Sequence, residues 1–261
     1  MKQELKSAFI SRGFIGAVLL MLLCLMGYSI PSRIVSVDFG EEFRDSALHL
    51  SMGGMYFGSV ILLFPFCAGL PYASSMVDEW RTGFLYQKAI RRSALNYAGR
   101  KLLAAALSGG AAAMLAFLLH AAIWNMAALP YDPVRYPYHQ LNFMDTSPFN
   151  AWQAYPLAWP IYMSIAAGLG VSAMVWAAVA LAVSVYVPDR LLALSVPVCL
   201  YFFWSSRLFT YLFGIKLPFP DSLFNDAGLD QMLDTLVMYG FVFAAAAAVY
   251  IAGVKRRVLC V

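Results

Sequence analysis

Six stretches of this chain, each approaching or exceeding the length of a membrane-spanning helix, contain no Asp, Glu, Lys or Arg apart from one Asp near the start of the last stretch. A helix that crosses the hydrocarbon core of a bilayer needs about 20 mostly apolar residues. These runs cover residues 14–30, 53–76, 102–129, 158–187, 191–204 and 233–254, and the one charged residue within them is Asp234. Only 12% of the residues are charged, against roughly 25% in soluble domains. The sequence therefore excludes a water-soluble domain and predicts an all-α integral membrane protein with about six transmembrane helices.

The fifth run is the shortest, and it spans a bilayer only if the helix continues past Arg207 into residues 208–215. No internal repeat and no low-complexity linker interrupts the chain. We therefore expect residues 1–261 to form a single transmembrane domain.

The basic residues indicate how the helices are oriented, because Lys and Arg near helix ends are retained on the cytoplasmic side. With the N-terminus inside, the cytoplasmic side holds 13 of the 18 Lys and Arg and only 4 of the 14 acids, a net charge of +9. The outer side then has a net charge of −5. The sequence predicts that both termini are cytoplasmic, and its overall charge of +4 gives no indication of nucleic-acid binding.

The residues before and within the first run have alternative interpretations. Leu5, Ala8 and Phe9 have helical spacing, with basic residues around the other face, which predicts an N-terminal interfacial helix on the inner leaflet. An ordinary basic leader to a membrane helix fits the same residues. The first run could also be a cleaved signal peptide, but it is longer than the usual apolar region of about 7–15 residues.

The sequence lacks the residues that several kinds of chemistry require. No G-x-x-x-x-G-K-[ST] motif occurs, so the chain has no P-loop and is not expected to hydrolyse ATP itself. The predicted spans carry no carboxylate, Lys or Arg in mid-membrane, which counts against a secondary transporter. The four cysteines have neither metal-ligand spacing nor positions for an extracellular disulfide. No catalytic, metal-binding or cofactor-binding residue is predicted.

Small residues in two of the runs favour close helix packing. Residues 170–173 resemble half of an intramembrane serine protease motif, but Ser172 has no histidine on a neighbouring helix at the same depth. Ala166, Gly170, Gly54 and Gly58 have the spacing that lets membrane helices approach closely. These faces predict packing either inside the chain or between two copies.

The loop at residues 75–101, between the second and third runs, is the most distinctive segment. It begins with acidic residues, passes through Gly83 and a short mixed segment, and ends in a basic stretch that enters the third run. A short helix that exposes Phe84 and Leu85 requires a surface to cover it. The basic residues of the loop would equally explain a resting position on anionic lipid. Composition alone leaves both interpretations open.

The order of residues in this loop resembles the coupling segment of ATP-binding-cassette (ABC) permeases of the type-two exporter class. In that family an acidic residue, a glycine, a short helix, a serine–arginine step and a closing lysine follow one another between spans two and three. A proline that many members have before the serine–arginine step is missing here. The matching positions are Glu79, Gly83, Phe84, Leu85, Lys88, Arg91, Arg92, Ser93 and Lys101.

The resemblance also covers the chain length and the six-span layout. It implies a permease subunit of an exporter in a prokaryotic plasma membrane, with a cytoplasmic coupling helix at residues 84–90. It further implies separate cytoplasmic ABC ATPase subunits that bind ATP and Mg, and a second permease copy or related permease. Glu79 is then expected to brace the loop against Arg81, Arg92 or a basic residue of the partner. A secondary transporter or channel, or a membrane enzyme or assembly factor, is the alternative function.

Overall fold

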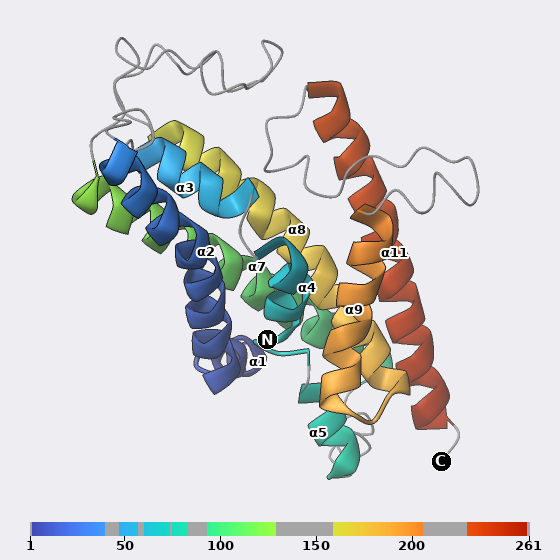
Figure 1. The fold of residues 1–261 in the computed structure, drawn as a ribbon. Helices are drawn as coiled ribbons and strands as arrows, with labels where there is room; N and C mark the ends of the chain where they lie inside the picture. Colours follow the sequence, from blue (N-terminus) through green and yellow to red (C-terminus); the bar gives the residue numbers. More distant parts are fainter. Residues whose placement is uncertain are drawn as a thin grey trace.

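The computed structural model of the chain describes residues 2–39, 47–56, 60–73, 75–82, 93–128, 159–205 and 229–259. Every regular element within these ranges is a helix (Figure 1). The helices are α1 (Lys2–Phe9), α2 (Arg12–Phe39), α3 (Ala47–Tyr56), α4 (Val60–Gly69), α5 (Ser75–Arg81), α7 (Ala94–Ala127), α8 (Trp159–Tyr186), α9 (Arg190–Ser205) and α11 (Leu229–Leu259). The predicted all-α class is confirmed for the described part of the chain.

Four of these helices are long and apolar enough to cross a membrane. The segments are Arg12–Ile34 in α2, Leu95–Ala127 in α7, Trp159–Tyr186 in α8 and Asp230–Arg257 in α11. Each contains a predicted run or nearly all of it and adds up to about a turn or two at its ends. The extension is expected because a helix is held by backbone hydrogen bonds, which continue through polar residues at the ends of an apolar run.

The second and fifth predicted runs form shorter helices. The second run corresponds to α3 and α4, of ten residues each, and ten residues rise only about 15 Å. The fifth run forms α9, which has 16 residues and rises about 24 Å. Each of these helices is shorter than the hydrocarbon core of about 30 Å. The described residues thus contain four helices that are long and apolar enough to cross a membrane, and three shorter apolar ones.

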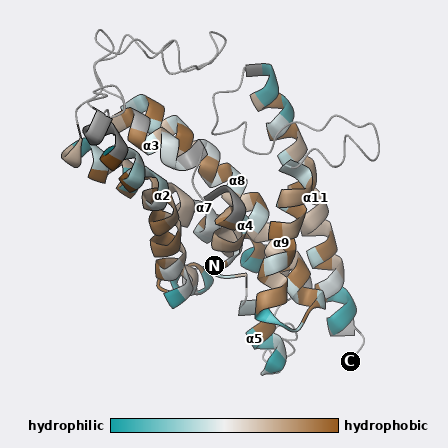
Figure 2. Ribbon diagram, in the orientation of Figure 1, coloured by the Kyte–Doolittle hydropathy of each residue, from teal (hydrophilic) through white to brown (hydrophobic). Residues whose placement is uncertain are grey.

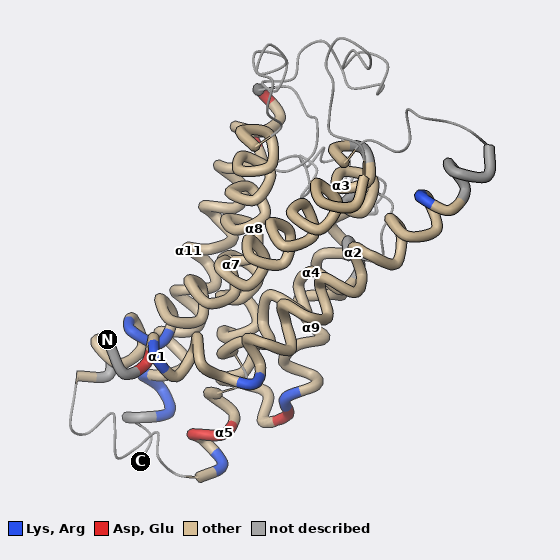
Figure 3. The backbone as a smooth tube through the Cα atoms, turned by 90° about the vertical axis from the view of Figure 1, so that its left-hand side faces the viewer, with Lys and Arg blue, Asp and Glu red and all other residues tan. Residues whose placement is uncertain are grey.

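The chain reverses direction between successive apolar segments. In Figure 1, α2 runs away from the end where α1 lies, and α3 and α4 run back toward it. The helices α7 and α9 again run away from that end, and α8 and α11 run back toward it. The first helix and the end of α11 therefore lie at the same end of the bundle. Most of the described Lys and Arg residues also lie at this end (Figure 3), as the charge pattern predicts for a cytoplasmic side.

The two outer long helices leave most of their residues exposed or only partly buried, whereas α8 is buried. In the most apolar part of α8, 78% of the residues are buried, against 28% in α2 and in α11. Leu23 of α2 and Phe241 of α11 are among the exposed apolar residues, and Figure 2 shows hydrophobic residues along both helices. Helix surfaces with exposed apolar side chains such as these suit contact with lipid acyl chains.

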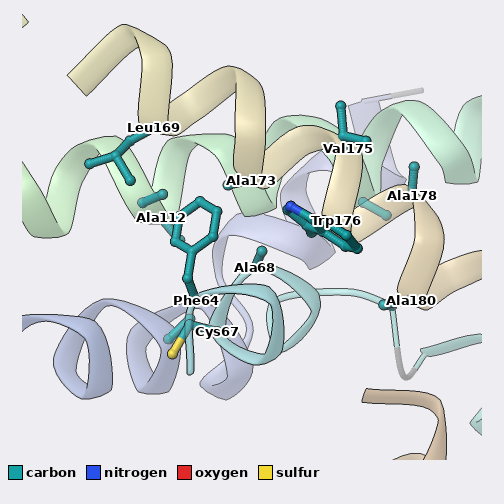
Figure 4. Close-up of a cluster of buried hydrophobic side chains, with 14 of the residues drawn as sticks. Phe64, Cys67, Ala68, Ala112, Leu169, Ala173, Val175, Trp176, Ala178 and Ala180 are labelled. Atoms are coloured by element: carbon teal, nitrogen blue, oxygen red, sulfur yellow. The ribbon is translucent and has the colours of Figure 1, made fainter. Parts of the chain in front are cut away.

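The centre of the bundle is the interface of α7 and α8, where small residues let the helices touch. A Cβ atom on Gly110 would lie 2.9 Å from the Gly170 carbonyl oxygen, and one on Gly170 would lie 2.7 Å from Met114. Figure 4 shows Phe64 of α4 pointing toward this interface, beside Trp176 of α8. The predicted small-residue face at Gly170 therefore packs inside the chain, and so does Gly54, whose Cβ position lies 2.9 Å from Ser29 Oγ. Gly58 lies outside the described residues.

Substitution of Gly109 by alanine is expected to destabilise the bundle by about 1–3 kcal/mol. A Cβ atom at this position would lie 2.5 Å from the Ala68 carbonyl oxygen of α4 and 2.8 Å from Ala177 of α8, so helices must move apart. The measurement is the free energy of unfolding in detergent. Gly240→Ala is the matched control, because no atom lies within 4 Å of its Cβ position, and equal stability of the two variants would contradict the prediction.

Candidate functional site

The described residues include three of the nine positions that match the coupling-segment pattern. Glu79 lies on α5, Ser93 directly precedes α7, and Lys101 lies on α7. The other six, and the predicted coupling helix at 84–90, lie outside the described residues: Gly83, Phe84, Leu85, Lys88, Arg91 and Arg92. The site can therefore be described at the two ends of the loop, where it enters and leaves the helical bundle.

The two ends are joined by a buried ion pair between Glu79 and Lys101. The Lys101 Nζ atom lies 2.7 Å from Glu79 Oε2, and the side chains are 0% and 15% exposed. The Tyr97 hydroxyl also donates to Glu79 Oε2, and Lys101 donates to the Tyr97 oxygen at 3.3 Å. The first and last residues of the pattern, which are 22 positions apart, thus hold each other.

Aromatic side chains surround this ion pair and provide partners for the charge. The Lys101 ammonium lies 5.6 Å from the ring centres of both Tyr72 and Tyr97, a distance at which cation–π attraction is favourable. Tyr250 of α11 is also buried, and its hydroxyl lies 4.0 Å from the Met76 sulfur. A charged amine is costly to bury unless it is paired, and here a carboxylate and aromatic rings pair with it.

The N-terminal helix completes the group of polar side chains. The Tyr72 hydroxyl, in the turn after α4, donates to the Glu4 carboxylate of α1. The Tyr72 side chain is itself buried. We refer to Glu4, Tyr72, Glu79, Tyr97, Lys101 and Tyr250 as the Lys101 cluster. Its members come from α1, α5, α7, α11 and the turn between α4 and α5.

The remaining polar residues of α5 contact the turn between α8 and α9. Arg190 Nε donates to Asp78 Oδ1 at 2.8 Å, and Arg81 donates to the Pro188 carbonyl oxygen at 2.8 Å. Both contacts are exposed to solvent. Glu79 pairs with Lys101 and Arg81 reaches the α8–α9 turn, and bracing of the loop by Glu79 against Arg81, Arg92 or a basic residue of the partner stays a prediction. Arg92, the other expected partner within the chain, lies outside the described residues.

A further contact joins α5 to the last helix. The Arg257 guanidinium lies 3.5 Å above the centre of the Trp80 ring. Consecutive residues of α5 therefore point to different helices, since Asp78 contacts Arg190, Glu79 contacts Lys101 and Trp80 contacts Arg257. A displacement of α5 would be transmitted to α7, to α11 and to the start of α9.

Ser93 has a local role that its position explains. Its hydroxyl accepts a hydrogen bond from the Asn96 backbone N–H at 3.4 Å and caps the N-terminus of α7, as serine commonly does. The loop that begins after α5 therefore ends at a defined residue. This cap and the Glu79–Lys101 pair fix the described residues on either side of residues 83–92.

Two other polar side chains, Ser172 and His120, make hydrogen bonds that indicate a role in helix packing. The Ser172 hydroxyl lies 2.7 Å from the Tyr239 hydroxyl of α11, which supports the packing interpretation over a protease nucleophile. His120 is buried and accepts from the Trp124 indole N–H at 3.0 Å, with the Ser29 hydroxyl also 3.0 Å away. Within the described ranges, no group of three or more His, Cys, Asp or Glu residues is placed to hold a metal ion.

Some members of the Lys101 cluster have sequence signals and others have none. Tyr97 precedes Lys101 by four residues, so the two lie on the same face of a helix, and that spacing is visible in the sequence. Glu4, Tyr72 and Tyr250 are distant in sequence, and only the packing of their helices brings them together.

No protein-family model matches the chain, and no curated protein or solved structure matches it. The residues and their contacts are therefore the basis for a functional conclusion.

Proposed function

We propose that this chain is the membrane-spanning permease subunit of an ATP-driven ABC exporter. In this proposal it has six spans, with α3 and α4 together forming the second and α9 belonging to the fifth. Both termini are cytoplasmic, and residues 79–101 form the coupling segment. Separate ATPase subunits bind ATP and Mg and dock on this segment, and two permease chains form the translocation pathway.

The observation that carries the proposal is the buried Glu79–Lys101 ion pair. These residues are the first and last of the pattern that resembles the coupling segment of type-two exporters. A loop that merely rested on lipid would not need a buried ion pair at its base, since surface charges suffice for lipid contact. A loop that receives a mechanical push needs a rigid base, and the Lys101 cluster supports such a role.

The contacts of α5 support a route for the movement. Closure of the ATPase subunits displaces the coupling segment, and α5 passes the displacement to α7 through Glu79, to the α8–α9 turn through Asp78 and Arg81, and to α11 through Trp80. Rigid helices that rock about their interfaces are a common way of switching a transport pathway. The reaction is vectorial movement, and the chain itself contributes no covalent chemistry.

The isolated chain is expected to show no ATP hydrolysis, because it lacks a P-loop. The measurement is phosphate release by the purified protein in detergent and in vesicles. Turnover above the buffer blank that is lost on mutation of a residue of this chain would contradict both this prediction and the proposal.

A membrane dimer, of two identical chains or of this chain with a related permease, is also expected. One set of about six helices supplies half of the twofold pathway that the proposal requires. Cross-linking in native membranes should trap a species of about twice the mass of the chain. Exclusive recovery of monomers under conditions that cross-link a known membrane dimer would argue against the permease.

The experiment that tests the proposal is purification of the tagged chain from its native membrane, followed by mass spectrometry. The expected result is a stoichiometric protein that contains a P-loop and is released when residues 83–92 are replaced by a Gly–Ser linker. The same protein must be retained when the exposed residues Lys255 and Arg256 are neutralised. Absence of any P-loop protein from a stable preparation would overturn the proposal.

A further inference from the structure

The N-terminal helix α1 has two different faces, and one of them holds the turn that leads into α5. Ala8 is fully buried, Leu5 packs against the core, and Glu4 accepts the hydrogen bond from Tyr72. The residues that follow α1 contact the same turn, since the Ser11 hydroxyl donates to the Pro71 carbonyl oxygen at 2.9 Å. Only two residues separate Tyr72 from the start of α5 at Ser75.

The first turn of α2 closes tightly on this segment. The Cβ position of Gly13 is in contact with the Leu70 carbonyl oxygen, so a side chain at this point would push the two backbones apart. Residues 4–13 and residues 70–73 therefore form one packed unit at the end of the bundle where α5 begins.

The end of α1 and the residues that lead from it into α2 form an exposed surface that combines apolar with basic residues. Ile10 is 69% exposed and Phe9 is 38% exposed, and Lys6 and Arg12 beside them are also exposed. The nearby acidic residue, Glu4, is engaged on the protein side by Tyr72. An apolar surface bordered by cations suits the boundary between anionic headgroups and acyl chains. The expected occupant of this surface is anionic lipid of the inner leaflet.

We propose that α1 is a lipid-dependent latch on the coupling segment. Anionic headgroups bind Lys6 and Arg12, Phe9 and Ile10 enter the acyl boundary, and the docked helix holds residues 70–73 through Glu4 and Ser11. Residues 70–73 then set the position of α5. The consequence for transport rests on the proposed function, whereas the binding of lipid and the ordering of α5 do not.

The first test is amide hydrogen exchange of the full chain in nanodiscs of phosphatidylcholine, with and without phosphatidylglycerol. We expect anionic lipid to slow exchange in residues 70–82 by about fivefold or more, since one basic residue near an anionic surface contributes about that factor. The double variant Lys6→Gln, Arg12→Gln should lose the difference between the two lipids. Neutralisation of Lys255 and Arg256, which are exposed at the end of α11, is the matched control and should retain it.

The second test separates lipid docking from the latch. In the Tyr72→Phe variant, a fluorescent probe at Ile10→Cys, in a background without other cysteines, should still report immersion in anionic nanodiscs. The effect of lipid on exchange in residues 75–82 should nevertheless be reduced, because the hydrogen bond to Glu4 is gone and only the Ser11–Pro71 hydrogen bond remains. Inorganic phosphate added to phosphatidylcholine nanodiscs should give no protection, which identifies the lipid as the ligand.

Equal exchange of the wild-type chain in both lipids would overturn the latch, as would an undiminished lipid effect in the Lys6, Arg12 or Tyr72 variants. These measurements contain no ATP and no partner protein. Failure of the latch is therefore distinguishable from failure of the proposed function, which is decided by the recovery of an ATPase.

Discussion

Substitution of Glu79 by alanine is expected to destabilise the folded bundle by about 3–5 kcal/mol, because it leaves a buried charge without its partner. Lys101 is fully buried and lies 2.7 Å from the Glu79 carboxylate. The measurement is the free energy of unfolding in detergent, and transport in vesicles should be uncoupled as well. A loss of less than about 1 kcal/mol, the range of exposed pairs, would contradict the proposed role of the ion pair.

Two further variants make this prediction specific. Asp78→Ala removes the adjacent residue of α5, whose pair with Arg190 is 42% and 57% exposed, and should cost no more than about 1 kcal/mol. The double variant Glu79→Ala, Lys101→Met should recover most of the lost stability, because no charge remains buried. If uncoupling persists in this stable double variant, the ion pair is needed for coupling as well as for folding.

Truncation of Phe84 to alanine is expected to weaken association with the ATPase subunit by about 2 kcal/mol, or about 30-fold, and to uncouple transport. Phe84 and Leu85 are the apolar anchors of the coupling helix in the permease interpretation, and buried anchors dominate protein interfaces. The measurement is co-purification of the ATPase with the variant, together with transport in vesicles. Normal membrane insertion of the variant is the control.

The opposite result would support the lipid interpretation of the same loop. If the loop only rests on anionic lipid, each of Lys88, Arg91 and Arg92 contributes about 1 kcal/mol and Phe84 little. Full transport by Phe84→Ala, with loss only when all three basic residues are neutralised, would mean that docking of an ATPase on this helix is wrong.

The helices and their approximate bounds are largely readable from the sequence, but the second and fifth predicted spans show the limit. A charge-free run indicates that a segment can enter a membrane, because the free energies of transfer of its residues from water add along the chain. It does not report where a helix begins or ends, because helix ends depend on backbone hydrogen bonds and local geometry. The α3 helix begins before the second run, and α2, α7 and α11 continue beyond the charged residues that bound their runs.

The site was only partly predictable for a related reason. The order of residues in the chain points to Glu79, Ser93 and Lys101 as site residues, and Tyr97 has a helical spacing to Lys101. That order does not predict that Glu79 pairs with Lys101 or that Arg81 contacts Pro188. Choosing among several basic partners for one carboxylate requires the distances between side chains from different helices.

The sequence by itself determined the all-α class and most of the apolar segments long enough to cross a membrane, and its charges predict which end faces the cytoplasm, because hydropathy and charge are sums over neighbouring residues. Only the tertiary structure decided that Lys101 is buried against Glu79, that α5 contacts three parts of the bundle, and that Gly54 and Gly170 pack internally. These features depend on contacts between residues as far apart as Asp78 and Arg190, which exist only once the helices have packed.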